Sequence, residues 1–371
     1  MKKICTLFVA ALCCATFTKA QEIANWSGWR TAAATFTFDD GAPSHITDVG
    51  PLFDEFGYKA TFFLVTNWNP NWEGFQALVN NGHEVGSHSK SHGQNMQGQE
   101  KSSKDSINAH ITGQDCNTVG YPNCNVPNDL TATKANYIAA RTCGGNDDPI
   151  MGVNGPADWY KVNTIITGSA DHDYYTTTAD AFVTVLQQTV NKSGWVVFMT
   201  HGITGKNNNG EATYSLTPLD ALRGALQWAQ NHDNDMWVTT FRNAAMYCKE
   251  RKAASFTLKS GDDSKKTYSL THYIADDLCQ YDYPLSLRVQ LPNGWSTAYV
   301  SQVGHEIQPQ IKDGYVYFDA IPNGGDIVLS ETAETIDNIT ATTTATKRIE
   351  NGQLLIERNG KTYTIQGQEV K

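Results

Sequence analysis

The chain has 371 residues, of which 40% are hydrophobic and 18% are charged. This length exceeds one average domain and predicts two or three. The composition is that of a soluble globular protein and excludes disordered, collagen-like and coiled-coil chains. The formal net charge of -10 argues against nucleic acid as a partner, because a protein that binds a polyanion needs a basic face. Neutral or cationic partners fit better.

The first 20 residues have the pattern of a secretory signal peptide. Two lysines precede an apolar run over residues 4–17, and the small residue Ala20 stands at the expected cleavage point. The run is too short to span a bilayer. We therefore expect residues 1–20 to be removed and the protein to be secreted, periplasmic or held at the cell surface, with no membrane span. A lipoprotein anchor on Cys13 or Cys14 is the alternative.

From residue 21 to residue 252, short apolar segments alternate with helix-like stretches. This pattern is typical of a parallel sheet or barrel with crossover helices, and hence of an α/β domain. The predicted strands cover residues 34–38, 60–65, 162–166, 195–200 and 236–240. The predicted helices cover residues 46–56, 72–80, 130–140, 179–192 and 219–231.

Beyond residue 252 the pattern changes to short alternating segments with turn pairs such as Asn293-Gly294 between them. We expect a small antiparallel β-sandwich domain over residues 253–331. Its predicted strands cover residues 256–258, 268–272, 285–291, 298–302, 315–320 and 326–330. Residues 332–371 are predicted to be a linker and a C-terminal β-hairpin, which is too small to be stable alone.

The cysteines beyond the signal peptide are Cys116, Cys124, Cys143, Cys248 and Cys279. In an oxidising compartment Cys116 and Cys124 are close enough in sequence to pair, and the odd number leaves at least one thiol unpaired. No two cysteines have the Cys-x-x-Cys spacing, so a thiolate zinc site is not expected.

Two histidines, His88 and His92, are four residues apart. We expect them on one face of a helical turn, so that both imidazoles reach the same metal ion. The zincin motif places a glutamate between its two histidines as the catalytic base. This segment, His88-Ser89-Lys90-Ser91-His92, has none, so a base must come from elsewhere.

Asp39 and Asp40 follow an alternating segment, Thr35-Phe36-Thr37-Phe38, and precede Gly41. They are therefore expected at the carboxyl end of a strand, where parallel α/β folds keep their active sites. Adjacent carboxylates repel each other unless a cation neutralises them, which suggests one aspartate as a metal ligand and the other as a base. The alternative is an ordinary turn. His201, directly after the apolar segment 195–200, is a third polar residue at a strand end, although a buried core histidine fits the same position.

These segments resemble the NodB-type polysaccharide deacetylases, carbohydrate esterase family 4. Thr37-Phe38-Asp39-Asp40-Gly41 is similar to the first motif of that family, His88-Ser89-Lys90-Ser91-His92 to the second, and Met199-Thr200-His201 to the fifth. The resemblance covers roughly residues 31–247.

The resemblance implies a distorted (β/α) barrel in which Asp40, His88 and His92 hold a divalent metal. Zn²⁺ is the first expectation, with Co²⁺ and Ni²⁺ as alternatives. It also implies that Asp39 acts as the base and His201 as the acid in the hydrolysis of acetyl groups. The expected substrate is an acetylated polysaccharide or oligosaccharide.

The third and fourth motifs depart from the best-known pattern. Gly120-Tyr121-Pro122-Asn123-Cys124 stands where many members have an arginine before two prolines. By position, Tyr121 and Asn123 would contact the substrate, and the backbone N–H of Asn123 would stabilise the oxyanion. Arg141 is the candidate to replace the missing arginine in orienting Asp39.

Asp158-Trp159 resembles the fourth motif, with Asp158 as an orienting residue and Trp159 beside the substrate. A surface arginine and a core tryptophan explain Arg141 and Trp159 about as well.

Other polar and aromatic residues have simpler interpretations. His83 is expected to form hydrogen bonds inside the fold and His172 to lie in a solvated loop. Trp68 and Trp72 follow the strand over residues 60–65, so they either stack on sugar rings or anchor a loop.

The leading hypothesis is a secreted, metal-dependent deacetylase that removes N-acetyl groups from amino-sugar polymers. One alternative is an O-acetyl esterase acting on a glycan such as acetylxylan, because the same chemistry cleaves esters. The other is a catalytically silent, carbohydrate-binding surface protein, suggested by the altered third motif and the appended sandwich. The sequence predicts neither the polymer nor the oligomeric state.

Overall fold

The structure is a computed structural model. It describes residues 21–143, 148–169, 174–275, 278–279 and 281–333, together with the backbone of further strands towards the C-terminus. The predicted signal peptide, residues 1–20, lies outside the described residues.

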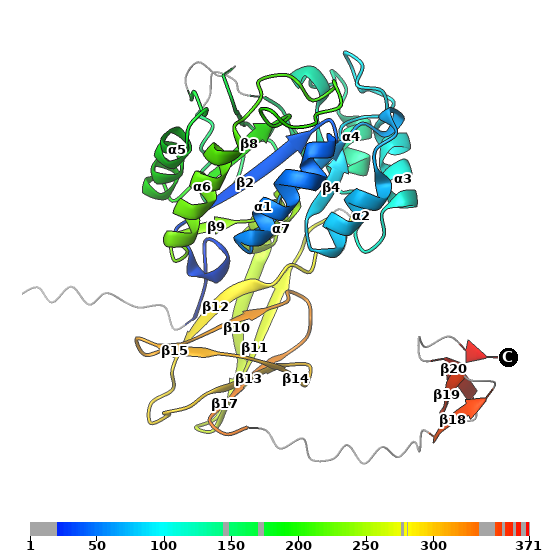
Figure 1. The fold of residues 1–371 in the computed structure, drawn as a ribbon. Helices are drawn as coiled ribbons and strands as arrows, with labels where there is room; N and C mark the ends of the chain where they lie inside the picture. The colour runs from blue at the N-terminus through cyan, green and yellow to red at the C-terminus, as the bar shows by residue number, and fades with distance from the viewer. Residues whose placement is uncertain are drawn as a thin grey trace, which may run out of the picture.

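A sheet of parallel strands forms the centre of the first domain (Figure 1). Its strands are β2 (Ala32–Asp39), β3 (Thr61–Leu64), β4 (Glu84–Ser87), β5 (Thr118–Gly120), β6 (Ala139–Arg141), β7 (Ile165–Ile166), β8 (Trp195–Thr200) and β9 (Met236–Val238). They follow the order β6-β5-β4-β3-β2-β8-β7, and β9 also pairs with β2. A parallel bridge between Arg141 and Val162 links the end of β6 to the segment that leads into β7. The sheet therefore closes on itself, which confirms the predicted distorted (β/α) barrel.

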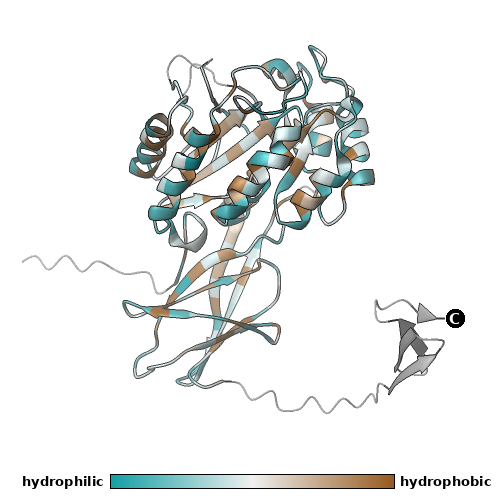
Figure 2. Cartoon of the chain, in the orientation of Figure 1, coloured by the Kyte–Doolittle hydropathy of each residue, from teal (hydrophilic) through white to brown (hydrophobic). Residues whose placement is uncertain are grey.

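All but the last of the described helices of this domain cover the outside of the barrel, and the last packs between the barrel and the second domain (Figure 1). In chain order the helices are α1 (Gly50–Glu55), α2 (Trp72–Asn80), α3 (Glu100–His110), α4 (Thr131–Asn136), α5 (Ala179–Asn191), α6 (Leu219–Asn231) and α7 (Phe241–Ala253). Figure 2 shows hydrophilic and hydrophobic residues interspersed along these helices, and apolar helix residues such as Phe182 and Leu222 pack in the cluster against the sheet. None of the helices in the described part of the chain is both long and apolar enough to cross a membrane.

The alternating residues of strand β2 explain why one face of the sheet packs against helices and the other faces the barrel interior. Its even-numbered residues, such as Phe36 and Phe38, pack in the cluster between sheet and helices. The polar odd-numbered residues make polar contacts instead. Thr37 donates a hydrogen bond to the carbonyl oxygen of Phe198, 2.8 Å away, and Asp39 contacts Arg141. Because side chains alternate between the two faces of a strand, the apolar set faces the helices and the polar set faces the barrel interior.

Several elements differ from the sequence expectation. The helix predicted over residues 130–140 is α4 followed by strand β6, whose alanines have a high helix propensity that burial in the sheet overrides. Strands β4 and β5 were not predicted because each is very short. Helix α3 was not predicted because Ile107 is the one apolar residue on its buried face. Helix α7 was not predicted because its buried residues, such as Ala244, Ala245 and Met246, run consecutively and do not recur every three to four residues.

The second domain is the predicted antiparallel sandwich. Its strands are β10 (Ala254–Gly261), β11 (Lys265–His272), β12 (Leu285–Gln290), β13 (Tyr299–Gln302), β14 (His305–Ile307), β15 (Gln310–Lys312), β16 (Tyr315–Ala320) and β17 (Ile327–Ser330). One sheet has the order β10-β11-β17-β13-β14 and the other β1-β12-β16-β15. Strand β1 (Gln21–Ile23) pairs with β12, so the chain begins in the sandwich before it enters the barrel.

The two domains share one apolar core. It runs from barrel residues such as Trp195 through helix α7 to sandwich residues such as Leu287. Across this junction the hydroxyl of Tyr247 donates to the carbonyl oxygen of Ala24, 2.9 Å away. The sandwich is therefore packed against the barrel as well as being connected to it.

In the C-terminal region the backbone of β18 (Thr346–Glu350), β19 (Gln353–Arg358), β20 (Lys361–Thr364) and β21 (Glu369–Val370) forms a small antiparallel sheet. The predicted hairpin corresponds to the pairing of β19 with β20.

Glu250 of α7 is buried at the junction between the domains. Its Oε1 accepts a hydrogen bond from the backbone N–H of Tyr283, 3.1 Å away, and its Oε2 has no hydrogen-bond partner among the described residues. Burial, together with the charge of Asp282, raises the pKa of Glu250 to about 8.

This raised pKa predicts a pH-dependent stability. Between about pH 4.5 and pH 8 the unfolded chain loses the proton of Glu250 while the folded chain keeps it, so stability falls as the pH rises. Glu250→Gln should remove this loss, which amounts to at most about 1.4 kcal/mol per pH unit. Thermal unfolding at pH 5 and pH 8 should show the variant matching the wild type at the lower pH and exceeding it at the higher. Equal melting temperatures at pH 8 would contradict the assignment, and the exposed Glu73→Gln serves as control.

Candidate active site

The backbone at the end of β2 turns both aspartates to the same place. Strict alternation would send Asp39 into the barrel and Asp40 towards the helices. Asp40 has a φ of 76°, a left-handed conformation that aspartate adopts at lower cost than most residues. Both residues therefore line one cavity.

Arg141 holds Asp39 from inside the barrel. Both side chains are buried, and Nη2 of Arg141 contacts Oδ1 of Asp39 and lies 2.5 Å from Oδ2. Burial alone would raise the pKa of Asp39, but the charge of Arg141 and of the nearby histidines holds it below its usual value. The carboxylate is consequently ionised.

Gly120 leaves the space that Arg141 occupies. A Cβ at this position would lie 2.4 Å from Nη2 of Arg141. The guanidinium also lies over the ring of Phe63, with its Cζ 5.1 Å from the ring centroid. The predicted orienting role of Arg141 thus has a specific contact, and β5, β3 and β6 together build it.

His88 and His92 converge on one point although no helix carries them. Residues 88–92 form a loop after β4, with left-handed φ values of 67° at Ser89 and 54° at His92. Oε1 of Gln99 accepts hydrogen bonds from the backbone N–H groups of Lys90 and Ser91. The expected helical turn is therefore wrong, and these bends in the loop bring the two rings to a centroid distance of 5.0 Å.

Asp40 completes a cluster with these histidines. Its Oδ1 lies 3.6 Å from Nε2 of His88 and 3.5 Å from Nε2 of His92. Two ligand atoms that are each about 2.1 Å from one tetrahedral zinc ion lie about 3.4 Å apart. Oδ1 of Asp40 is buried without a hydrogen-bond partner among the described residues, so the three side chains fit a divalent cation.

The protonation states agree with this fit. Nδ1 of His88 lies 2.8 Å from the carbonyl oxygen of Gly120. A carbonyl only accepts, so Nδ1 carries the proton and the lone pair of Nε2 points towards Asp40. Burial lowers the pKa of His88 to about 3 and that of His92 below its usual value. Burial and the charge of Asp39 raise the pKa of Asp40 to about 8, which a bound cation would reverse.

His201 follows β8 and lines the same cavity as Asp39 and the histidine pair. Burial lowers its pKa, against the opposing effect of Asp39. Nε2 of His45 lies 2.8 Å from the carbonyl oxygen of His201 and donates to it. Burial lowers the pKa of His45 to about 4, so a neutral imidazole fixes the backbone that carries His201.

The cavity has a volume of about 360 Å³. It is lined by Asp39, Asp40, Trp68, His88, His92, Tyr121, Asn123, Cys124, Cys143, Ile166, Met199, His201, Glu211 and Tyr214. Tyr121 and Asn123 are therefore where the sequence placed them. Of the two tryptophans considered, Trp68 lines the cavity and packs on His92 at a centroid distance of 4.9 Å, whereas Trp72 stacks on His110.

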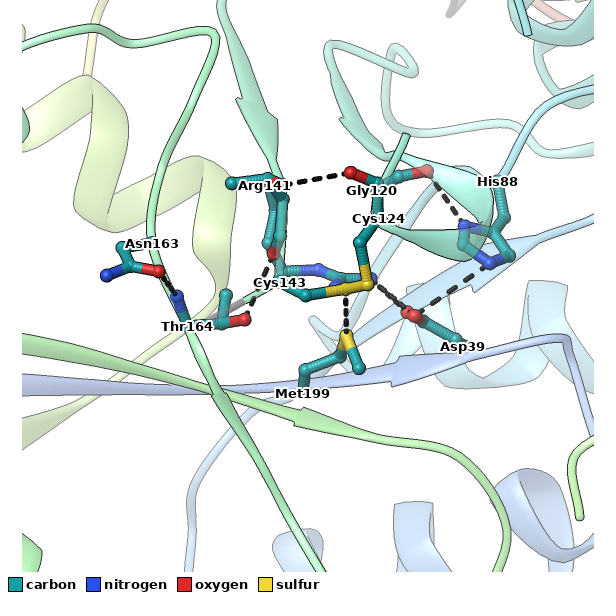
Figure 3. Close-up of a disulfide and its surroundings, with 10 residues drawn as sticks. Asp39, His88, Gly120, Cys124, Arg141, Cys143, Asn163, Thr164 and Met199 are labelled. Atoms are coloured by element: carbon teal, nitrogen blue, oxygen red, sulfur yellow. Dashed lines mark hydrogen bonds and ion pairs between the residues drawn. A yellow bond between two sulfur atoms is a disulfide. The ribbon is translucent and has the colours of Figure 1, made fainter. Parts of the chain in front are cut away.

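A disulfide joins Cys124 to Cys143 at the wall of this cavity (Figure 3). The pairing of Cys116 with Cys124 that the sequence allowed does not occur, and Cys116 is a buried free thiol in the apolar core. The cysteines that do pair follow the ends of the neighbouring strands β5 and β6, which brings their Cα atoms to 5.0 Å despite a sequence separation of 19. The bond connects the loop of Asn123 to the segment after Arg141.

The fourth-motif residues are not brought to the cavity. Trp159 packs on Trp195 at a centroid distance of 6.3 Å and lies under the ammonium group of Lys249. Oδ1 of Asp158 accepts a hydrogen bond from the backbone N–H of Tyr160, which makes it a turn residue. The expected substrate contact of Trp159 and orienting role of Asp158 are corrected to a packing and a turn role.

His83 behaves as expected. Its Nδ1 accepts from the backbone N–H of Ala60, and its Nε2 lies 3.2 Å from Oδ1 of Asp54. His172 lies outside the described residues.

Sequence reasoning missed three residues around the cavity: His45, Glu211 and Tyr214. His45 lies in the helical segment before α1, where it resembles any buried helix residue. Glu211 and Tyr214 lie in the polar loop between β8 and α6, which has no periodic pattern. Only the position of that loop, directly after His201, could have drawn attention to them.

The cavity thus combines the ionised carboxylate of Asp39, the imidazole of His201 and a candidate cation site. Three side chains, those of Asp40, His88 and His92, form that site. Three protein ligands leave a position open for water or substrate. Such an arrangement is suited to metal-assisted hydrolysis.

Comparison with known proteins agrees with the motifs. Residues 30–138 match the family model described as polysaccharide deacetylase. This confirms the predicted resemblance for the segment that carries Asp39, Asp40, His88 and His92, and His201 lies beyond it.

Individual relatives are more distant. The chain is 24% identical over 327 residues to a gellan lyase from a Bacillus species, an alignment that covers 82% of this chain and 13% of that protein. The chain therefore spans only a small part of the length of this curated relative.

Three solved structures are also similar. A putative polysaccharide deacetylase from Mycobacterium smegmatis has a TM-score of 0.44 and 18% identity, covering 65% of this chain and 98% of that one. The carbohydrate-esterase domain of a multidomain xylanase from the hindgut metagenome of Trinervitermes trinervoides has a TM-score of 0.39 and 20% identity, covering 57% and 89%. A peptidoglycan deacetylase from Bacillus subtilis has a TM-score of 0.40 and 17% identity, covering 60% and 94%.

The cluster predicts a specific loss of metal binding. His88→Ala or His92→Ala should weaken Zn²⁺ binding by more than about 100-fold, since removing a ligand exceeds the effect of an outer-shell partner. Isothermal titration of the folded protein measures this directly. His305→Ala, an exposed residue of the sandwich, is the control, and unchanged affinity in both ligand variants would contradict the site.

Proposed function

We propose that this chain is a secreted, divalent-metal-dependent hydrolase that removes N-acetyl groups from an amino-sugar polymer. The match of residues 30–138 to the polysaccharide deacetylase family model supports this proposal. The observation that carries the proposal is the convergence of Asp40, His88 and His92 beside an ionised Asp39 in one cavity. The disulfide between Cys124 and Cys143 supports export, because such bonds persist in oxidising compartments.

The metal is proposed to be Zn²⁺, with Co²⁺ and Ni²⁺ as functional substitutes. When bound by Asp40, His88 and His92, such an ion would supply Lewis acidity to the acetyl carbonyl group and to water.

The protein side chains then have distinct tasks. Asp39, kept ionised by Arg141, accepts the proton of the attacking water at a carboxylate oxygen. The backbone N–H of Asn123, in the left-handed conformation of its loop, is placed to stabilise the negative charge that develops on the acetyl oxygen. His201, on the other side of the cavity, gives a proton to the departing amine. Trp68 offers an aromatic wall for a sugar ring.

The activity is tested by acetate release from a panel of N-acetylated and O-acetylated glycans. A chelator should abolish release, and added Zn²⁺ or Co²⁺ should restore it. Asp39→Asn should lower the rate by about 10² to 10⁴, the range for a lost general base, while Zn²⁺ binding persists. Asp313→Asn, in a sandwich turn where asparagine tolerates the φ of 51°, should retain full activity.

Substantial turnover by Asp39→Asn would reject its role as the base. Absence of acetate release from every glycan, by protein shown to bind Zn²⁺, would favour the silent carbohydrate-binding alternative. Release only from O-acetylated glycans would make the protein an esterase.

The disulfide between Cys124 and Cys143 should affect kcat and should leave the affinity for Zn²⁺ unchanged. Cys124→Ser combined with Cys143→Ser frees the loop of Asn123 and the segment after Arg141, and small displacements of catalytic groups cost about 10- to 100-fold. We expect such a fall in kcat with unchanged Zn²⁺ affinity. A phosphine reductant that binds Zn²⁺ weakly, tris(2-carboxyethyl)phosphine, should lower the activity of the wild type and leave that of the double variant unchanged. Equal kcat values before and after reduction would contradict this role.

A further inference from the structure

A second, smaller cavity adjoins the candidate active site. It has a volume of about 250 Å³ and shares Asp40, Trp68 and Glu211 with the first. Its remaining lining consists of Gly41, Ala42, Pro43, Asn69, Pro70, Asn71, Asn208 and Asn209. A polymer whose acetylated unit lies at the metal cluster would extend into this space past Trp68, so the second cavity fits a neighbouring sugar unit.

The charges in the two cavities are of one sign. Asp39, Asp40 and Glu211 line them, and no lysine or arginine does so among the residues that the structure describes. Asp39 is paired with Arg141, and Asp40 belongs to the metal cluster. The carboxylate of Glu211 is exposed, and the described part of the chain offers it no ion pair or side-chain hydrogen bond. It is therefore the one carboxylate in these cavities that is left for a ligand.

The loop that carries Glu211 is folded tightly. Oδ1 of Asn208 accepts hydrogen bonds from the hydroxyl of Ser44 at 2.7 Å and from the backbone N–H of Ile203 at 3.0 Å. The backbone N–H of Glu211 in turn donates to the carbonyl oxygen of Asn208, 3.3 Å away. Buried Asn208 thus anchors the loop to the barrel and holds the backbone of Glu211 at the boundary between the two cavities.

The proposed reaction creates the group that such a carboxylate would bind. Water adds its oxygen to the acetyl carbon, the C–N bond breaks, and the nitrogen takes protons to leave acetate and an ammonium group on the sugar. Each turnover converts a neutral unit into a cationic one. A neighbouring unit that has already reacted would therefore present a positive charge to the second cavity.

On the basis of the proposed function, we propose that Glu211 binds the ammonium group of a deacetylated amino sugar adjacent to the unit being hydrolysed. The preferred substrate is then a partly deacetylated amino-sugar polymer, and deacetylation spreads from units already converted. Polymers that carry uronate, lactyl or phosphate groups at that position are disfavoured by the same charge.

The test compares two tetrasaccharides of N-acetylglucosamine, one fully acetylated and one with a single free amine, at pH 6. The full-length, Zn²⁺-loaded protein should show a higher kcat/KM for the partly deacetylated one. Glu211→Gln should lower the ratio of the two kcat/KM values by about threefold to fivefold, the range of an exposed ion pair. The ratio of the wild type should also fall in 0.5 M salt, to about the ratio of the variant.

Glu306→Gln, which removes an exposed carboxylate of the sandwich, is the matched control and should leave the ratio unchanged. If the ratio of the two kcat/KM values is the same in the wild type and in Glu211→Gln, the inference about Glu211 is overturned. The proposed function still stands in that case, provided that the wild type releases acetate. A tenfold loss of Zn²⁺ affinity in Glu211→Gln also overturns it, because Glu211 would then be a metal ligand. No acetate release from either tetrasaccharide by the wild type overturns both proposals.

Discussion

The pairing of Arg141 with Asp39 inside the barrel is the interaction on which the site depends. Two adjacent carboxylates in a buried place repel each other, and leaving either unpaired costs several kcal/mol. Arg141 neutralises Asp39 directly, whereas the raised pKa of Asp40 shows that this second carboxylate is unstable as an anion without a further positive charge. The same geometry therefore provides one stabilised anion and, beside it, a carboxylate that a divalent cation would stabilise.

This pairing in turn constrains the sheet around it. The guanidinium crosses β5 only because Gly120 has no side chain there, and the carbonyl oxygen of the same glycine orients His88. The disulfide between Cys124 and Cys143 then closes the gap between the ends of β5 and β6 beside these groups (Figure 3). The short strand β5 thus helps to position Asp39 through Arg141, His88 through a hydrogen bond, and the loop that carries Asn123. The sandwich contributes no residue to the described cavity lining. The carboxyl end of β2, where the cavity lies, points away from the sandwich (Figure 1).

Prediction from the sequence succeeded where a residue pattern maps directly onto a position. Alternation over 35–38 is sufficient to place Asp39 at the carboxyl end of a strand, and the apolar segment 195–200 is sufficient to place His201 directly after one. It failed where the backbone leaves regular structure. The spacing of His88 and His92 suggested a helical turn, but the loop reaches the same convergence through left-handed residues. Trp159 was misplaced because it lies in a turn, and tertiary packing, which a short motif does not report, decides where that turn lies relative to the cavity.

The sequence by itself determined the order of the domains and the alternating barrel pattern, because these follow from local periodicity. Its resemblance to a known family suggested Asp39 as a base and Asp40, His88 and His92 as candidate ligands. Only the tertiary structure decided which cysteines pair, that Arg141 reaches Asp39, and that Glu211 stands at the edge of the cavity. Those relations join residues that are far apart in the chain and are set by how strands lie side by side and how loops close over them. Local sequence carries no record of such distances, since the same letters occur in ordinary turns, helices and packed cores.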